Sequence, residues 1–363
     1  MLTAGHVGSR AAGSEPGRVE RGTAAGTTSV QMVGSSVRVP FNGSIAPICI
    51  QVEGARAVRR ALRRFQPDVV HVHEPLVPGV SLSATWFARV PVVATFHAYC
   101  PPSFDACLYS FAAQCLRPLM RRVAVRLGVS QAAATCAASR IGGDVQVVPN
   151  GVDLDAFANP GPTALPPGRK LLFVGRLERR KGFDVAVRAF TRLSEKFPDL
   201  VFLVAGIGAC GRAADAAPPA VRQRIVMLGE VDDSRLPSVY AAADVFIAPA
   251  VGHESFGTVL LEAMAAGRPI VATDIEGYRE VVRADVDALV VSPRDEAALA
   301  DAIGRILDTP ALAARLGLSA RARVQRFAWD VVTDAVERAY GVALGASIVN
   351  HAVVNVPVVG RSL

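Results

Sequence analysis

Short apolar runs alternate with amphipathic segments along most of the chain. The apolar runs are rich in Val, Leu, Ile and Ala and end at turn residues, which is typical of strands buried on both faces of a sheet. Strands separated by helical segments indicate βαβ units, and therefore parallel sheets with right-handed crossovers. In the first half of the chain the predicted strands are 69–73, 92–97, 123–129 and 145–148. In the second half the predicted strands are 170–174, 201–205, 225–228, 245–248, 269–273 and 288–291, and the predicted helices are 184–197, 233–242 and 256–266.

The alternation is interrupted by a stretch rich in proline and glycine at residues 157–169, which can continue neither a helix nor a strand. A chain of 363 residues most often folds as two domains, because single cores stop growing near ~250–300 residues. We therefore predict an N-terminal domain at 37–158, a linker at 159–169 and a C-terminal domain at 170–330. Residues 331–363 are expected to form a helix that returns toward the N-terminal domain, followed by a tail.

Residues 1–36 are rich in Gly, Ala, Ser and Thr and show no apolar periodicity, so we expect a disordered leader there. No signal peptide is visible, because a continuous apolar segment is missing near the N-terminus. The longest uncharged stretch, 340–360, approaches the roughly 20 apolar residues that a membrane span needs. Polar residues and a proline interrupt it, and a surface-packed or frayed tail is the preferred interpretation.

A formal net charge of +7 favours anionic partners, which include nucleic acid, acidic lipid and phosphorylated small molecules. Nucleic acid is disfavoured, because the basic residues are not interleaved with stacking aromatic residues and aromatics make up only 6% of the chain. The six cysteines contain no C-x-x-C pair, so a zinc site is not indicated.

A basic loop follows the predicted strand 170–174 and is flanked by Gly175 and Gly182. Arg176 and Lys181 stand five residues apart in it, where a planar guanidinium and a point charge can clamp a diphosphate. Lys181 is informative because the chain has only three lysines among 39 basic residues. The alternative is a solvated basic loop without a ligand.

A second constellation follows the predicted strand 245–248. The residues that begin the helix there are Ser255, Phe256, Gly257 and Thr258. Unpaired backbone N–H groups and the positive end of the helix dipole make such a start a phosphate cradle. Glu254 before the helix and Glu262 further along it would grip the hexose and the ribose of a nucleotide sugar. Alternatively, Glu254 caps the helix and Glu262 is a surface carboxylate.

Together with His97 in Ala-Thr-Phe-His and with Asn150-Gly151, these motifs resemble the GT-B retaining glycosyltransferases of family four. The resemblance covers residues 37–340 and implies an α/β fold of two Rossmann-like domains that face each other across a cleft. Within that family the chain is most similar to the actinobacterial phosphatidylinositol alpha-mannosyltransferases. The stretches that carry this similarity are 39–44, 67–75 and 252–257.

The resemblance implies roles for the residues of the predicted donor site. Arg176 and Lys181 would neutralise the diphosphate of GDP-mannose as it leaves, which is the electrostatic stabilisation that usually dominates such catalysis. Glu254 would hold the donor sugar and Glu262 the ribose. Members of this family need no metal ion and no cofactor, and the acidic pairs at 153–155 and 285–287, which look like D-x-D metal motifs, are interpreted as loop acids.

On the acceptor side the resemblance implies that His97 faces the reacting sugar and that Asn42 places the inositol ring of a phosphatidylinositol acceptor. A lone histidine at a strand end is otherwise a packed structural residue. These enzymes begin with a strand, a glycine-rich loop and a helix, which residues 1–36 do not show. We therefore expect an incomplete N-terminal domain in a chain that starts late.

The segment 54–65 is expected to form a basic amphipathic helix that suits an anionic membrane surface, at about 1 kcal/mol per cation near it. Its basic residues are Arg56, Arg59, Arg60, Arg63 and Arg64. In similar mannosyltransferases such a helix docks on the lipid, which implies a cytoplasmic protein at the inner face of the plasma membrane. The alternative is the solvated face of an ordinary packing helix.

The leading hypothesis is therefore transfer of mannose from GDP-mannose to a phosphatidylinositol-type acceptor. Two alternatives stay open. One is a family-four enzyme with another donor or acceptor, such as a UDP-sugar. The other is an inactive homologue that binds a nucleotide sugar or a membrane.

Overall fold

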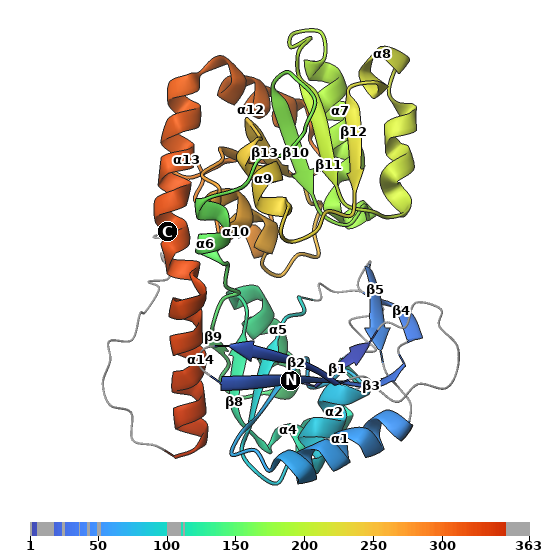
Figure 1. Cartoon of the computed structure of the whole chain (residues 1–363), viewed down its shortest axis with the longest axis vertical. Coiled ribbons are helices and arrows are strands. Elements are labelled where there is room, and N and C mark those ends of the chain that lie inside the picture. The colour runs from blue at the N-terminus through green and yellow to red at the C-terminus, as the bar shows by residue number, and fades with distance from the viewer. Residues whose placement is uncertain are drawn as a thin grey trace.

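The computed structural model of the chain describes residues 52–99, 110–111 and 113–345. Before residue 52 it describes the five strands β1 (Leu2–Gly5), β2 (Arg18–Thr23), β3 (Gly26–Ser35), β4 (Val37–Phe41) and β5 (Ser44–Ile48). The two domains of the molecule lie one above the other in Figure 1. Asn42 and residues 346–363, the greater part of the predicted tail, lie outside the described residues.

The C-terminal domain is built on a six-stranded parallel sheet of order β12-β11-β10-β13-β14-β15. Its strands are β10 (Lys170–Val174), β11 (Val201–Ala205), β12 (Ile225–Gly229), β13 (Val245–Ala248), β14 (Ile270–Thr273) and β15 (Leu289–Val291). Its α-helices are α7 (Phe183–Leu193), α8 (Pro219–Arg222), α9 (Leu236–Ala241), α10 (Thr258–Ala265), α11 (Glu276–Arg279), α12 (Glu296–Asp308) and α13 (Pro310–Val324). The 3-10 helices are η1 (Arg179–Lys181), η2 (Ala209–Ala216) and η3 (Gln325–Phe327).

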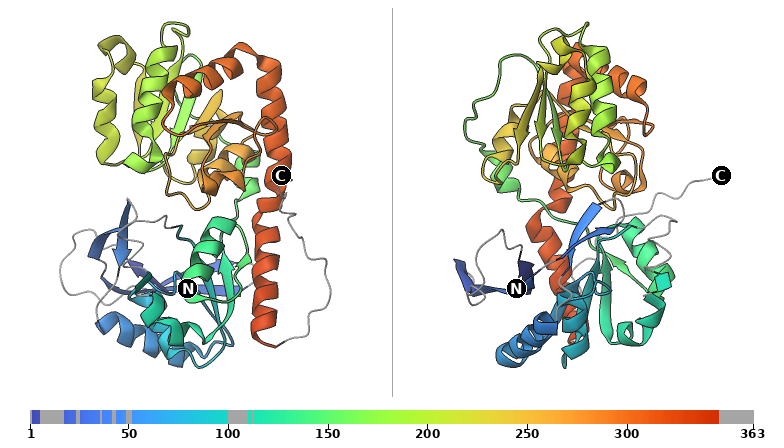
Figure 2. Two further views of the ribbon diagram at one scale, coloured as in Figure 1. Left: turned by 180° about the vertical axis from the view of Figure 1, so that it is seen from behind. Right: turned by 90° about the vertical axis from the view of Figure 1, so that its right-hand side faces the viewer.

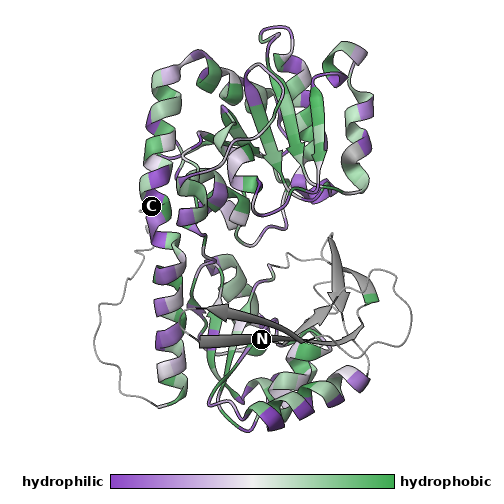
Figure 3. Cartoon of the chain, viewed as in Figure 1, coloured by the Kyte–Doolittle hydropathy of each residue, from purple (hydrophilic) through white to green (hydrophobic). Residues whose placement is uncertain are grey.

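Both faces of this sheet are buried, which explains why its strands are almost uniformly apolar. Leu171 and Phe173 of β10 pack in one core cluster with α7 and α12, while Leu172 between them packs in a second cluster with α9 and α10. In Figure 3 the strands of this sheet are largely hydrophobic, while the helices around them carry hydrophilic residues as well. The sheet therefore holds the loops at its carboxyl edge on a rigid base.

The N-terminal domain contains a four-stranded parallel sheet of order β6-β7-β8-β9. Its strands are β6 (Val70–His73), β7 (Val92–Phe96), β8 (Val123–Gly128) and β9 (Gln146–Val147). Its helices are α1 (Val52–Phe65), α2 (Val80–Phe87), α4 (Arg117–Met120) and α5 (Gln131–Ile141), and the short helix α6 (Leu154–Ala158) follows β9. Among the described residues β6 pairs on one side only, with β7.

The C-terminal helix α14 (Trp329–Ala343) crosses back to the N-terminal domain. It follows α13 along the same side of the molecule in Figures 1 and 2. Val332 and Ala339 of α14 pack with Val93 of β7 and Val125 of β8, so α14 covers one face of the N-terminal sheet. The other face packs on α1, α2 and α5. None of the described helices is long and apolar enough to cross a membrane.

Two parts of the structure differ from the sequence-based assignment. Residues 1–36 are predicted to be disordered, whereas β1, β2 and β3 form a three-stranded sheet there. β2 pairs antiparallel with β3 and β1 pairs parallel with β3, a pairing that apolar periodicity does not reveal. In the predicted N-terminal domain, α6 packs instead on α9 and α10, and the rings of Phe157 and Tyr240 lie 5.8 Å apart.

Candidate active site

Two loops at the carboxyl edge of the C-terminal sheet are locked together by their backbones. Gly182 ends the basic loop after β10 with φ of 70°, and a Cβ atom on it would lie 1.9 Å from the carbonyl oxygen of Pro249, which follows β13. Two residues before Gly182 and two residues after Pro249, a hydrogen bond joins the same loops: the N–H of Val251 donates to the carbonyl of Arg180 at 2.8 Å. Only glycine allows this approach, and it places the side chain of Lys181 beside the loop that precedes α10.

The carboxylate of Glu254 is the meeting point of the two loops. Its Oε1 atom lies 2.7 Å from Nζ of Lys181 and also accepts a hydrogen bond from Arg180. The Glu254 side chain is only 8% exposed, and the two cationic side chains are 15% and 12% exposed. A buried carboxylate of this kind depends on its partners, because an unpaired charge in such a place is strongly destabilising.

Arg176 occupies a more open position than Arg180 and Lys181. Its guanidinium is 53% exposed and pairs at 3.1 Å with Glu178, which in turn pairs with Arg180 at 2.8 Å. Sequence reasoning missed Arg180, because three consecutive basic residues, 179–181, offer no signal for which one turns inward. The cluster therefore contains three cations and two carboxylates, with a net charge of +1.

Burial lowers the pKa of Lys181, and the nearby Glu254 carboxylate acts against that shift. The like charges of Arg180 and Arg176 lower the pKa of Lys181 further. The positive charges of Arg176, Arg180 and Lys181 therefore repel one another. An anion that binds between them would relieve this repulsion.

Helix α10 begins at Thr258, two residues later than predicted, with Gly257 as its N-cap at φ of 86°. A Cβ atom on Gly257 would lie 2.5 Å from the ring of Tyr278, so this glycine too is fixed by packing. The side chain of Phe256 is buried, with its ring 5.9 Å from that of Phe327. Phe256 therefore anchors the loop, while the backbone of Ser255, Gly257 and Thr258 forms the open end of the helix.

Glu262 is held inside the domain by a partner that the sequence does not reveal. Its Oε2 atom accepts a hydrogen bond of 2.7 Å from the hydroxyl of Tyr240 on α9. Burial raises the pKa of Glu262, although this hydrogen bond lowers it in part. The alternative that Glu262 is a free surface carboxylate is therefore wrong.

His97 follows β7 at the carboxyl edge of the N-terminal sheet, where its neighbours fix its position. Its Nε2 atom lies 2.7 Å from Nδ1 of His73, at the end of β6. The carboxylate of Glu74 accepts hydrogen bonds from the backbone N–H groups of His97 and Ala98, at 2.5 and 2.6 Å. Sequence reasoning named His97 alone, although His73 and Glu74 stand in the stretch 67–75 that carries the family resemblance.

A second pair of contacts extends this network to the C-terminal helix. His71 of β6 bonds to the hydroxyl of Tyr340 on α14 at 2.8 Å and to Thr95 at 2.7 Å, and its ring stacks on His73 at 4.7 Å. Burial, followed by the charges of neighbouring histidines, lowers the pKa of both His71 and His97 to about 4. Both imidazoles are therefore neutral at neutral pH.

The carboxyl edges of the two domains meet through hydrogen bonds between their loops. The N–H of Gln131, at the start of α5, donates to Glu280 at 2.6 Å. Burial and then a hydrogen bond with Glu276 of α11 raise the pKa of Tyr99 to about 12. Tyr99 comes two residues after His97, so its contact with Glu276 places the segment that follows β7 next to the C-terminal domain.

The basic helix α1 presents its arginines to solvent and its apolar side to the domain. Val58 is fully buried, while the five arginines named from the sequence, Arg56, Arg59, Arg60, Arg63 and Arg64, are exposed. The structure thus places them at a surface, on the N-terminal domain and away from the loops described above (Figure 1).

One carboxylate of each acidic pair has a partner within the protein. The carboxylate of Asp153 caps α6 by accepting from the N–H of Ala156, and Asp287 is buried with an ion pair of 2.7 Å to Arg283. In the part of the chain that the structure describes, no three His, Cys, Asp or Glu side chains are grouped as metal ligands. The positive charge at the site is supplied by the basic loop.

Comparison with known proteins places this arrangement in a family. Residues 11–156 match the family described as Glycosyltransferase Family 4, and residues 168–309 match that described as Glycosyl transferases group 1. The chain is 36% identical over 320 residues to the phosphatidyl-myo-inositol mannosyltransferase of Mycobacterium tuberculosis, with 86% of this chain and 84% of the relative covered.

Solved structures share the fold. Sucrose-phosphate synthase from Thermosynechococcus elongatus superposes with a TM-score of 0.71 at 23% identity, covering 92% of this chain and 87% of that one. Anabaena HepE in complex with UDP-glucose gives a TM-score of 0.67 at 21% identity, covering 81% and 85%. The predicted GT-B arrangement of two Rossmann-like domains is confirmed.

Replacement of Gly182 by alanine tests whether the two loops depend on backbone contact. The new Cβ atom meets the Pro249 carbonyl and a left-handed backbone, so Gly182→Ala is expected to lower the free energy of unfolding by about 1–3 kcal/mol. Gly341→Ala is the matched control, because that position in α14 is open and alanine there should stabilise by roughly 0.5–1 kcal/mol. Equal effects in urea denaturation would contradict the proposed docking of the loops.

The neutral histidines predict how stability depends on pH. In the unfolded chain His71 and His97 protonate near pH 6.5, whereas in the folded protein they stay neutral down to about pH 4. Their contribution is complete above pH 6.5 and is lost as the pH falls toward 4. We expect the melting temperature to fall across this range, and less steeply in His71→Gln. An unchanged slope in that variant would remove His71 from this account.

Proposed function

Because the chain belongs to glycosyltransferase family 4, we propose that it transfers mannose from GDP-mannose to a phosphatidylinositol-type lipid at a membrane surface, with retention at the anomeric carbon. The protein is a glycosyltransferase. The choice of donor and acceptor rests on its similarity to the mycobacterial phosphatidyl-myo-inositol mannosyltransferase. The observation that carries the proposal is the cluster of Arg176, Arg180 and Lys181 around Glu254, beside the start of α10.

The cation cluster carries positive charge, which would stabilise a nucleoside diphosphate as it leaves the sugar. When the bond between the anomeric carbon and the phosphate oxygen breaks, both electrons leave with the diphosphate and its negative charge grows. Lys181 and Arg180 are already held in place, so they stabilise that charge without reorganising. The first backbone N–H groups of α10 add a second source of positive potential. The proposal therefore assigns no step to a metal ion.

In this proposal the carboxylates of Glu254 and Glu262 bind hydroxyl groups of the donor. Only Oε1 of Glu254 takes part in the two ion pairs, so its Oε2 atom can accept from a hydroxyl of the hexose. Glu262, fixed by Tyr240, would accept from the ribose hydroxyls. Hydroxyl groups that bond to charged acceptors are held more tightly than those that bond to neutral ones.

The neutral state of His97 suits a contact with a sugar hydroxyl. A neutral imidazole has one N–H and one acceptor nitrogen, and the bond between His97 and His73 uses one nitrogen of each ring. The tautomer of His73 therefore sets whether His97 presents a donor or an acceptor to the reacting sugar. His73 is a positioning residue in this scheme, and Glu74 fixes the backbone that carries His97.

The membrane part of the proposal rests on α1. Five exposed arginines on a helix whose apolar side is buried would be attracted to a surface of anionic lipid, which brings the enzyme to its acceptor. Asn42, proposed to place the inositol ring, lies outside the described residues. The protein is accordingly proposed to act peripherally, at the inner face of the plasma membrane.

A thermal-shift titration with GDP, UDP and their sugars tests the donor. We expect GDP and GDP-mannose to raise the melting temperature, by an amount that corresponds to about 2.7 kcal/mol at a hundred times the dissociation constant. A response to UDP-sugars alone would exclude GDP-mannose and favour the UDP-sugar alternative. No response to any nucleotide would contradict the donor site. Binding without transfer to any lipid would favour an inactive nucleotide-sugar-binding homologue.

Substitutions at the two central residues test the mechanism. Lys181→Ala and Glu254→Gln are expected to lower transfer about 10²- to 10³-fold, because each removes a preorganised charge from the reacting centre. Lys196→Ala and Glu195→Gln are matched controls on the exposed surface of the same domain, and both should transfer at the wild-type rate. Radiolabelled mannose incorporated into lipid is the measurement. Wild-type rates in both central variants would remove this active-site assignment.

A further inference from the structure

A groove of about 660 Å³ opens on the N-terminal domain between α1 and the end of α2. Its residues directly precede three strands of the sheet: Val70 begins β6, Val90 comes before β7, and Arg122 comes before β8. The groove therefore lies at the amino edge of the sheet, whereas His97 and the other candidate active-site residues lie at the carboxyl edge. A ligand in this groove is not placed to take part in the reaction.

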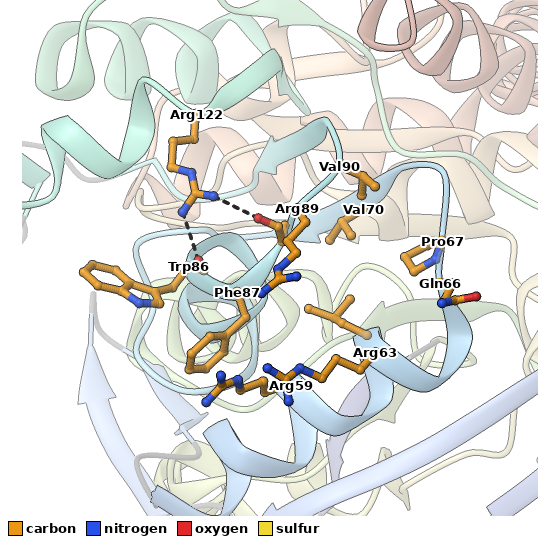
Figure 4. A pocket seen from close by; sticks show the side chains of 12 residues that line it. Arg59, Arg63, Gln66, Pro67, Val70, Trp86, Phe87, Arg89, Val90 and Arg122 are labelled. Atoms are coloured by element: carbon orange, nitrogen blue, oxygen red, sulfur yellow. Dashed lines mark hydrogen bonds between the residues drawn. The ribbon is translucent and has the colours of Figure 1, made fainter.

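Four arginines from three segments line the groove (Figure 4). Arg59 and Arg63 come from α1, Arg89 from the loop after α2, and Arg122 from the loop before β8. All four are exposed, and no carboxylate is among the lining residues. Four like charges that converge without an internal counter-ion repel one another, and a bound anion would remove that repulsion.

Two of these arginines are held in place by the fold. Arg122 donates to the backbone carbonyls of Trp86 and Ala88, both at 2.9 Å, and so ties the end of α2 to the base of β8. The guanidinium of Arg59 lies 5.6 Å from the centre of the Phe87 ring. By contrast, Arg63 and Arg89 have no ion pair with any residue in the described part of the chain. The groove thus combines fixed cations with two that are available to a ligand.

Aromatic side chains distinguish this groove from a plain basic surface. Trp86 lines it and is 60% exposed, and Phe65, at the last position of α1, is 77% exposed. Figure 4 shows Trp86 and Phe87 beside the guanidinium groups. A free phosphate ion would neutralise the arginines but leave these rings in water. A phospholipid would satisfy both, because tryptophan is enriched at the level of lipid headgroups.

We propose that this groove binds the phosphate of one anionic phospholipid as a discrete site, separate from the acceptor. The proposal rests on the proposed function only in that it places the protein at a lipid surface. The phosphate lies among Arg63, Arg89 and the fixed cations, and Trp86 enters the interfacial layer beside it. The N-terminal domain is then oriented by a specific contact and not by the net charge of α1 alone.

The two tryptophans of the chain allow a direct test. In the variant Trp329→Phe, Trp86 is the only tryptophan, and its fluorescence reports on the groove. Vesicles of phosphatidylcholine with phosphatidylglycerol should shift this emission to the blue, and vesicles of phosphatidylcholine alone should not. Soluble glycerol phosphate at the same phosphate concentration should leave it unchanged. An equal shift with glycerol phosphate would mean a site for a free anion and would overturn the assignment to lipid.

A matched pair of arginine variants separates a discrete site from general attraction. Arg89→Gln removes a cation from the groove, while Arg121→Gln removes one from an exposed neighbouring position that does not line it. Vesicle co-sedimentation should show about tenfold weaker binding for Arg89→Gln than for Arg121→Gln, as loss of a charge-assisted hydrogen bond implies. Equal weakening would reduce the groove to part of a diffuse basic surface. The thermal shift with GDP checks that both variants are folded.

The outcomes also distinguish this proposal from the proposed function. If the wild-type protein transfers mannose to acceptor in detergent micelles but shows no Trp86 response to anionic vesicles, the groove assignment is wrong and the proposed function stands. If Trp86 responds and Arg89→Gln is selectively weakened while no transfer occurs, the lipid site stands and the proposed reaction is wrong.

Discussion

The buried carboxylate of Glu254, shared between Lys181 and Arg180, is the contact on which the site depends. It joins the loop after β10 to the loop after β13, and those strands are neighbours in the sheet. The contact requires that the two backbones approach closely at Gly182, where any side chain would collide with Pro249. The order of the strands, the glycine and the ion pairs therefore act together, and they fix Arg180 and Lys181 beside the open end of α10.

This arrangement explains how Lys181 and Arg180 can be largely buried and still be available to bind an anionic ligand. Glu254 and Glu178 compensate two of the three positive charges, which keeps the cost of burial low while no anion is bound. The remaining positive charge and the helix dipole favour a diphosphate over a neutral ligand. In the proposed function, the neutral His97 on the facing domain adds no charge that would compete for the diphosphate. In this proposal the C-terminal domain supplies positive charge, and the N-terminal domain supplies a neutral hydrogen-bonding group.

Much of the C-terminal domain could be predicted from the sequence, because its strands are continuous apolar runs and its motifs follow them directly. The strands β10, β11 and β13 have the predicted bounds, and Lys181 and Glu254 are in contact. Arg180, Tyr240 and the link from Tyr340 to His71 were missed, because each depends on which side chains two distant segments bring together. Periodicity places a residue on a face, but the register of packing decides its partner.

The two cationic regions of the protein differ in a way that indicates different partners. At the carboxyl edge of the C-terminal sheet Lys181 and Arg180 are largely buried and paired with Glu254, so their charge is partly compensated within the protein while no ligand is bound. At the amino edge of the N-terminal sheet the groove cations are exposed and no carboxylate lines the groove, so their counter-charge comes from the surroundings. An extended anionic surface supplies such charge continuously, whereas a substrate does so only while it is bound. Under the two proposals, transfer takes place at the carboxyl edge of the C-terminal sheet and attachment to lipid at the amino edge of the N-terminal sheet.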